Sequence, residues 1–359
     1  MDTLTHALSG ALVARLLVAR GAPQAAADPG PAPLPWQAVV CGLVAGAFPD
    51  VDVVAQLFGD LAYLTQHRGL THSVLLLPFW AAGLAWLMSR AFARTRVPGG
   101  WRALLPLMAA GIAIHIAGDW ITQFGTMLLQ PFSDRRFGLG AMFIIDLVLT
   151  GTLVAGLALA AAFPRARWPS ALGLALACGW VGVAWMGQQE AIAVGERQAR
   201  ALGITAPVIV VMPRPASPFN WTVSVDDGAR YHVAHVNTRR TEPLVAGPDA
   251  NFIRRFSAPY EPVAAATWQV VPRFGAADAP PWIRTAWNEP AFGFFRWFAQ
   301  TPALLSWDER AQGRCAWFHD LRFMFPGRDE SPFQFGVCRK GGAPARLFRL
   351  EGGQPRALD

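Results

Sequence analysis

Charged residues are scarce in this sequence. Asp, Glu, Lys and Arg make up 15% of the 359 residues, whereas 53% are hydrophobic, which is not typical of an ordinary soluble domain. The hydrophobic residues crowd the first 190 positions, in long runs poor in charge. We therefore predict an α-helical multi-pass membrane domain. The longest apolar runs are 74–88, 104–117, 141–163 and 171–186.

Lysine is almost absent, since Lys340 is the only one, and the net charge of +7 comes from arginine. No cluster of basic residues interleaves with aromatic ones, so no nucleic-acid partner is expected. The arginines instead flank apolar segments, as the positive-inside rule requires, with about six helical elements of which the first two are short enough to be partial spans. The expected elements are 3–20, 36–49, 73–92, 103–124, 141–163 and 169–190.

This arrangement predicts a multi-pass membrane protein with both termini on the non-cytoplasmic side. The pattern of a cleavable signal peptide is missing from the start, because Asp2 and His6 stand where a positive region would be. We therefore expect the N-terminus to be retained. A Pro/Ala-rich linker at 21–35 separates the first two elements.

The composition changes beyond residue 205. The segments 207–212, 220–236 and 332–340 favour strands, and Asp227-Gly228 is a hairpin signal inside the second. The sequence thus predicts a membrane-embedded helical domain with a site at 1–190, a helical connector at 191–205, and a small, mostly-β soluble domain at 206–359. We find no internal repeat.

Cysteine is also rare. Cys41 and Cys178 fall in apolar segments, where a free thiol is usually a small hydrophobic residue. Cys315 and Cys338 lie in the soluble part, and a disulfide between them requires that this part face an oxidising compartment. The sequence leaves this pairing open.

Histidines and aspartates gather in the membrane half. Ionisable groups at membrane depth are costly and need a partner, a cavity or a metal. His115 and Asp119 stand four apart, on one face of a helix, and the expected topology brings the others near one membrane face. A His/Asp cluster without cysteine favours a divalent metal, zinc or else manganese, as one or two ions. The residues concerned are His6, Asp50, Asp52, His67, His72, His115, Asp119 and Asp146.

Each of these residues also has a plainer interpretation. His6 alone is more often a hydrogen-bonded helix residue than a ligand, and either Asp50 or Asp52 alone could be a solvated turn residue. His232, His235 and His319 have no matching carboxylate set and are expected to be structural. Asp60, Asp134 and Arg136 are expected to be exposed loop charges. The coincidence of the whole set favours a metal site.

The same residues carry a family resemblance. "MDTLTHALSG", "FPDVD", "HRGLTHS", "HIAGDWITQFGTMLLQPFSDRRFGL" and "IIDLV" resemble the successive motifs of the YdjM/YbcI-like inner-membrane metal-dependent hydrolases, over residues 1 to about 150. More distantly, the order of His and Asp is similar to that of zinc-dependent phospholipase C, but no second His-x-x-x-Glu helix follows. The resemblance implies a hydrolase site at His6, Asp50, Asp52, His67, His72, His115 and Asp119.

These parts predict a metal-activated water that hydrolyses a phospholipid or another lipid-linked (phospho)ester. The metal ligands would be His67, His72, His115, Asp119 and one or both of Asp50 and Asp52. A remaining carboxylate, Asp52 or Asp146, would act as general base, and Arg68, Arg135 and Arg136 would bind phosphate.

The alternative is a non-catalytic membrane protein that binds or transports metal or serves as a scaffold. A transporter should show paired broken helices or repeat symmetry, and the sequence shows neither.

Overall fold

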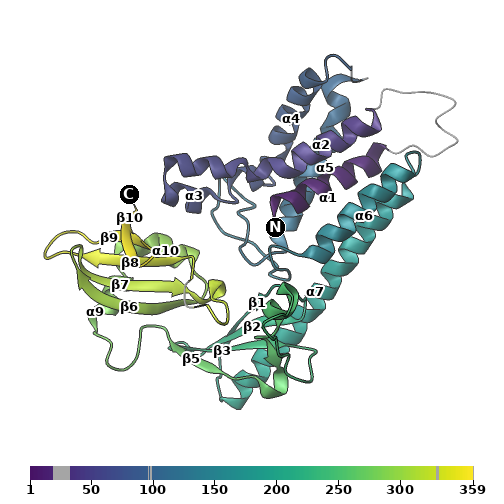
Figure 1. The fold of residues 1–359 in the computed structure, drawn as a ribbon. Coiled ribbons are helices and arrows are strands. Elements are labelled where there is room, and N and C mark those ends of the chain that lie inside the picture. The colour runs from purple at the N-terminus through teal and green to yellow at the C-terminus, as the bar shows by residue number, and fades with distance from the viewer. Residues whose placement is uncertain (19–32, 96, 98, 329–330, 359) are drawn as a thin grey trace. The chain divides into compact units, whose positions relative to one another are not determined.

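The computed structural model describes residues 1–18, 33–95, 97, 99–328 and 331–358. Most of the linker expected at 21–35 lies outside these ranges, as do Arg20 and Arg96. The chain forms two compact units: Met1–Phe58 with Gln66–Met186, and Gly59–Thr65 with Gly187–Asp359. We call them the helical unit and the β unit, and Figure 1 shows the elements of each.

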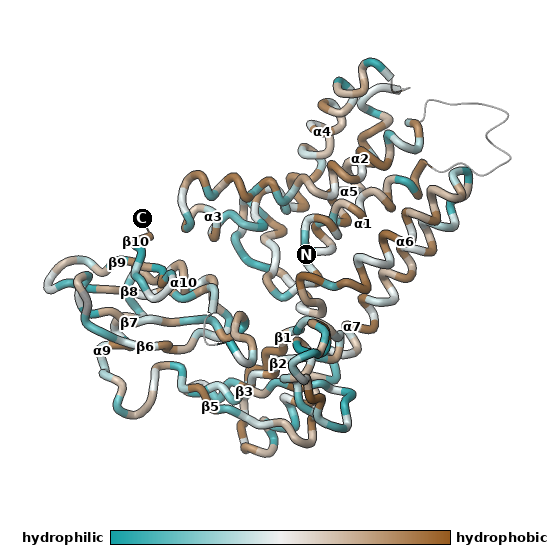
Figure 2. Tube along the Cα trace, in the orientation of Figure 1, coloured by the Kyte–Doolittle hydropathy of each residue, from teal (hydrophilic) through white to brown (hydrophobic). Residues whose placement is uncertain are grey.

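The helical unit contains helices near all six expected positions, and it adds a 3-10 segment, η1, directly after α2. Apolar residues run along these helices, whereas polar and apolar residues alternate more in the β unit (Figure 2). The elements are α1 (Thr3–Val18), α2 (Pro35–Ala47), η1 (Phe48–Phe58), η2 (Leu70–His72), α4 (Leu77–Ala91), α5 (Gly100–Trp120), α6 (Leu147–Ala162) and the first part of α7 (Trp168–Ala201).

Among the described residues, length and hydropathy identify three helical segments able to cross a membrane: Pro35–Phe58, Gly100–Trp120 and Trp168–Ala201. A fourth span results if Asp60–His72 and Leu77–Ala91, which are bent by 80° at their break, count as one. The helices α1 and α6 are apolar but shorter. The chain is therefore a helical membrane protein with about three candidate spans, and the expected six-element count is not confirmed.

Glycines allow α1 and α2 to pack backbone against backbone. A Cβ on Gly10 would overlap the Gly42 carbonyl oxygen, and a Cβ on Gly46 would overlap the His6 carbonyl oxygen. A Cβ on Gly111 of α5 would likewise overlap the Cβ of Ala45. Small residues permit such approach between apolar helices, so the polar ends of α1, α2 and α5 come together. A core of small and aliphatic side chains, including Ala14, Ala38, Cys41, Ala81, Leu104 and Ile112, packs beside this crossing.

The β unit holds two five-stranded sheets, one ordered β1-β2-β3-β4 with β5 paired to β3, the other ordered β10-β9-β8-β7-β6. Their strands are β1 (Val208–Pro213), β2 (Asn220–Asp226), β3 (Arg230–Asn237), β4 (Glu261–Pro262), β5 (Gln269–Pro272), β6 (Pro302–Arg310), β7 (Gly313–Asp320), β8 (Gln334–Arg339), β9 (Arg346–Glu351) and β10 (Gln354–Ala357). Short helices α3 (Asp60–Gln66), α8 (Phe252–Ser257), α9 (Trp282–Trp287) and α10 (Gly293–Phe298) accompany them, with 3-10 turns η3 (Val263–Ala265), η4 (Pro290–Phe292) and η5 (Leu321–Phe323).

The local expectations for the β unit are confirmed. Strands occupy the three predicted segments, and β2 pairs with β3 around Asp227 and Gly228, whose φ of 94° suits glycine. Cys315 and Cys338 stand directly opposite each other on β7 and β8 and form a disulfide. The question that the sequence left open is thus answered by strand register.

Candidate metal centre

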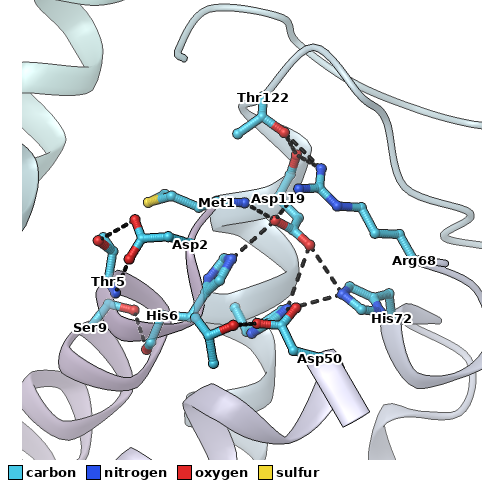
Figure 3. Close-up of polar contacts among 12 residues, drawn as sticks. Met1, Asp2, Thr5, His6, Ser9, Asp50, Arg68, His72, Asp119 and Thr122 are labelled. Atoms are coloured by element: carbon cyan, nitrogen blue, oxygen red, sulfur yellow. Dashed lines mark hydrogen bonds and ion pairs between the residues drawn. The ribbon is translucent and has the colours of Figure 1, made fainter. Parts of the chain in front are cut away.

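Four side chains from three elements converge in the helical unit (Figure 3). Asp50 comes from η1, His72 ends η2, and His115 and Asp119 lie one turn apart on α5. Each offers one ligand atom, and all four atoms lie within 4.8 Å of one another. The donor set of two imidazoles and two carboxylates suits a divalent ion such as zinc or manganese.

The two imidazoles face each other through nitrogens that can bind a metal. His115 Nδ1 lies 2.6 Å from the Gly46 carbonyl oxygen, which only accepts, so Nδ1 carries the proton and donates it. The Nε2 atom of His115 therefore keeps its lone pair, and it lies 3.0 Å from His72 Nε2. His72 Nε2 is in turn 3.0 Å from Asp119 Oδ2. Ligand bonds of about 2.0–2.1 Å in tetrahedral geometry separate neighbouring ligands by roughly 3.3 Å, and these two spacings of 3.0 Å are close to that value.

Burial of the four side chains is uneven. His72, His115 and Asp119 are fully buried, whereas the Asp50 side chain is 20% exposed. Asp50 Oδ1 lies 3.6 Å from His115 Nε2, and Thr3 Oγ1 donates to Asp50 Oδ2 over 2.5 Å. The open edge of the group is therefore at Asp50, between the start of α1 and η1.

Cationic and polar groups surround the buried Asp119 carboxylate, as Figure 3 shows. The Met1 amino group pairs with Oδ1, and Arg68 Nη2 and His6 Nε2 each lie 3.0 Å from the same oxygen. His6 also stacks on the His115 ring, with centroids 3.7 Å apart. His6 thus lies outside the four-residue group and contacts two of its members.

Asp52 and His67 form a separate pair beside the centre. Both Asp52 oxygens lie 3.2 Å from His67 Nδ1, and Oδ2 accepts the Arg68 backbone N–H over 2.7 Å. Asp52 Oδ2 is also 3.7 Å from His72 Nδ1, on the side of that ring away from the group. Arg68 has a left-handed backbone (φ 59°), uncommon outside glycine, which accompanies the packing of this loop on Asp52.

Arg68 lies against the centre. Its side chain is buried, and Nη1 donates to Thr122 Oγ1 over 2.7 Å while Nη2 pairs with Asp119. The Arg68 Nε is buried without a hydrogen-bond partner among the described residues. Arg136, expected as an exposed loop charge, is half-buried and donates through Nη2 to the His67 carbonyl oxygen.

Asp146 and Arg135 have other contacts. The Asp146 carboxylate caps α6 by accepting the Leu149 N–H, and it also accepts the Trp180 indole N–H. Arg135 is exposed, with its guanidinium 5.2 Å from the centre of the Phe137 ring. These contacts give no support to a catalytic role for either residue.

The sequence interpretation missed Gly46 and Thr122. Gly46 both admits the His6 backbone and supplies the carbonyl that fixes His115. A signal for it existed, because Gly42 and Gly46 form a G-x-x-x-G pattern within an apolar segment, typical of close helix packing. Thr122 had no comparable signal.

The histidines of the β unit fit the structural role expected for them. His235 contacts Thr222 Oγ1, and burial lowers the pKa of His235 to about 4. Burial also lowers the pKa of His319 to about 4. His232 lies 3.1 Å from Asp227 Oδ2 at the hairpin.

Comparisons with known proteins agree with the motif analysis. The family model described as YdjM inner membrane protein matches residues 1–191, which include all four members of the group. The uncharacterised protein YfhP of Bacillus subtilis (strain 168) is 30% identical over 147 residues, or 41% of this chain and 42% of that relative's length. No solved structure matches. None of these comparisons shows the likeness to phospholipase C.

Proposed function

This chain belongs to the YdjM inner membrane protein family, and from that premise we propose that it is a membrane-bound metal-dependent hydrolase. The observation that carries the proposal is the group of Asp50, His72, His115 and Asp119, in which three side chains are buried and Asp50 is 20% exposed. The Nε2 atoms of His72 and His115 and the Oδ2 atom of Asp119 face one another at one buried point, where a shared divalent ion would satisfy all three.

The four residues would hold one divalent ion, zinc or manganese, with a second ion at Asp52 and His67 as the two-ion form of the proposal. A bound ion of this kind lowers the pKa of a coordinated water toward neutrality and so supplies a nucleophile. The backbone carbonyl of Gly46 keeps the His115 lone pair on Nε2, and His6 supports Asp119.

In the one-ion form of the proposal, proton transfer is assigned to Asp52 and His67. The His67 side chain is 21% exposed and therefore reachable, and the Asp52 carboxylate orients its ring through Nδ1. A carboxylate-oriented imidazole beside a metal site suits general acid–base catalysis. Asp146, considered from sequence for the same role, is occupied as a helix cap.

The proposed substrate is a phospholipid or another lipid-linked phosphoester. Leu4, which follows Thr3 in the sequence, is 62% exposed, and Val51, which follows Asp50, is 46% exposed. Exposed apolar side chains of this kind suit a substrate with an acyl chain. The partnerless Arg68 Nε beside Asp119 would hold a phosphate oxygen. The disulfide of the β unit supports placing that unit on the non-cytoplasmic side of the inner membrane.

The second candidate is a non-catalytic metal-binding or transport protein, or a scaffold. One observation favours it: the segment containing His72 belongs to a helix pair bent by 80°, as in broken spans of transporters. The described residues contain one such pair, not two related ones.

Metal analysis and a phospholipid-hydrolysis assay on the detergent-purified protein separate the candidates. We expect a bound divalent metal in the wild-type protein, its loss in His115→Ala and Asp119→Ala, and loss of hydrolysis with metal retained in Asp52→Asn. Metal content unchanged in the first two variants would refute the site. Metal-loaded protein with no hydrolysis of any phosphoester would favour the non-catalytic candidate.

A further inference from the structure

The β unit presents a basic aromatic pocket that the metal centre does not use. We define the patch by six residues that line it: Phe252, Arg255, Phe256, Tyr260, Phe325 and Arg328. Phe252 is 59% exposed and Phe256 is 41% exposed, and Ile253 between them is 45% exposed. Large apolar side chains this exposed and this close together usually mark an interaction surface.

The charge of the patch has one sign. Arg255 and Arg328 line it, and no carboxylate among the described residues does. Asp329 and Glu330 follow in the sequence but lie outside the described residues. The Arg328 guanidinium is 5.9 Å from the Phe256 ring centre and 5.7 Å from that of Phe325. The Arg328 guanidinium thus lies against two aromatic rings, and contact of this kind uses the face of the guanidinium rather than its N–H groups.

A buried arginine adds to this positive charge. The Arg214 guanidinium is buried, 4.6 Å from the Phe325 ring centre. It donates to Thr222 Oγ1, the Arg322 carbonyl oxygen and the Met212 sulfur, none of which is a carboxylate. Because Phe325 lines the pocket, the positive charge of Arg214 lies directly behind this side chain. The patch combines an apolar body with a cationic field.

The helix α8 within this patch has the features of a helix that lies at a membrane surface. Asn251 caps it by accepting the Arg254 N–H, and Phe252 and Phe256 stand four apart on one face. Arg254 donates to the Val245 carbonyl and Arg255 to the Pro248 carbonyl, which fixes the preceding loop and the 74% exposed Val245 beside it. Exposed phenylalanines with arginines between them are typical of helices that lie in the bilayer interface.

We propose that this patch binds anionic phospholipid headgroups at the bilayer surface, with Phe252, Ile253 and Phe256 at the boundary of the acyl region. Charge complementarity selects the occupant, because arginines attract anionic headgroups while the phenylalanines need an apolar phase. The β unit is tethered to the membrane part of the chain, since α7 is one continuous helix that begins in a candidate span and ends at Ala201, among the residues of the β unit. The inference does not depend on the proposed hydrolase activity.

The test uses the full chain in vesicles of phosphatidylcholine, with or without phosphatidylglycerol, that carry a nitroxide on the headgroup. In a Cys178→Ser background, an environment-sensitive fluorophore is attached at Gly247→Cys, next to the loop that Arg255 holds. A matched reporter is placed at Gly342→Cys, between β8 and β9. Both glycines have open space where a side chain would begin and ordinary backbone angles.

We expect quenching at position 247 to rise in the anionic vesicles and position 342 to stay unchanged. Arg255→Gln and Arg328→Gln should each weaken the anionic-lipid effect by about fivefold, and Phe252→Ser should reduce quenching in both lipids. Equal quenching at 247 in neutral and anionic vesicles, or an increase in anionic vesicles that survives the double arginine variant, would overturn the proposal. The sheet signal in circular dichroism and the intact disulfide establish that each variant is folded.

Discussion

At the scale of single residues, the centre separates groups that offer a ligand atom from groups that orient one. His115 shows the difference within one ring. Its Nδ1 donates to the Gly46 carbonyl, which orients the ring, and its Nε2 faces His72 as the atom that offers a lone pair. His6 is as buried as His115, yet it contacts the oxygen of Asp119 that points away from His72. Burial alone therefore does not identify a ligand, whereas the direction of each nitrogen does.

Replacing His6 and His115 by phenylalanine should have different consequences. His115→Phe removes a ligand atom, and we expect no bound metal by elemental analysis. His6→Phe keeps a ring stacked on His115 but loses the contact with Asp119, so metal affinity should fall by about 10–100-fold while saturation is still reached. Competition with a chelator measures both. Equal metal loss in the two variants would contradict the distinction.

The stability of the β unit should fall in mild acid. Burial lowers the pKa of His235, with a further contribution from Arg214, and burial lowers the pKa of His319, in each case from 6.5 to about 4. Between pH 6.5 and about pH 4 the unfolded chain therefore binds more protons than the folded chain. The contribution of these histidines to the free energy of unfolding is complete above pH 6.5 and decreases as the pH falls toward 4.

Thermal unfolding of the purified protein, followed by tryptophan fluorescence from pH 7 to pH 4, tests this expectation. The variants His235→Gln and His319→Gln cannot titrate in this range, so each should flatten the pH dependence. A wild-type melting temperature that is constant over the range would disprove the assignment.

At the scale of elements, the crossing of α1 and α2 decides whether the centre can form. Gly10 and Gly42 allow contact along the crossing, and Gly46 allows it at the end where His6 lies. Because the Gly46 carbonyl also accepts the His115 N–H, helix packing and ligand orientation depend on one residue. The continuation of α2 into η1 then places Asp50 four residues further on.

Gly46→Ala should therefore disturb packing and metal binding together. The added Cβ would overlap the His6 carbonyl oxygen, and overpacking of this kind costs about 1–3 kcal/mol. We expect a lower melting temperature in detergent and reduced metal content. Gly83→Ala in α4 is the matched control, because its Cβ would meet open space and alanine favours the helix. Normal metal content in Gly46→Ala would refute this coupling.

At the scale of the whole molecule, the chain joins a helical membrane unit to a β unit stabilised by its own disulfide. Cys315 and Cys338 are 23 residues apart, and closing a loop of that length stabilises a fold by about 3 kcal/mol. The double variant Cys315→Ala and Cys338→Ala should unfold its β unit at lower denaturant concentration. A reductant should have the same effect on the wild-type protein and none on the variant, with Cys178→Ser as an unaffected control.

The topology expected from the sequence places Arg94 of the helical unit and Gly228 of the β unit on opposite sides of the membrane. Cysteines introduced at Arg94 and at Gly228, each in a Cys178→Ser background, should be labelled by an impermeant reagent from opposite faces of oriented vesicles. Labelling of both from one face would refute the arrangement. The result would also show whether the disulfide faces an oxidising compartment.

Sequence alone determined much of this protein, because its signals are local. Hydropathy identified the helical unit, alternation and Asp227-Gly228 identified β2 and β3, and the i,i+4 spacing of His115 and Asp119 put both on one face of α5. The motifs also sufficed to indicate the family. Which helices are long enough to span was not determined by the sequence, since the segments expected at 3–20 and 141–163 correspond to the shorter apolar helices α1 and α6.

Only the tertiary structure decided the partners. His67 and His72 are two histidines of one short segment, yet His72 faces His115 and His67 faces Asp52. Asp52 lies on the far side of the His72 ring, Arg136 replaces Arg135 beside His67, and Cys315 meets Cys338 through strand register. The physical reason is that a ligand set depends on the directions of side chains from distant segments, and those directions are set by the glycine-mediated crossing of α1 and α2 and by the left-handed turn at Arg68.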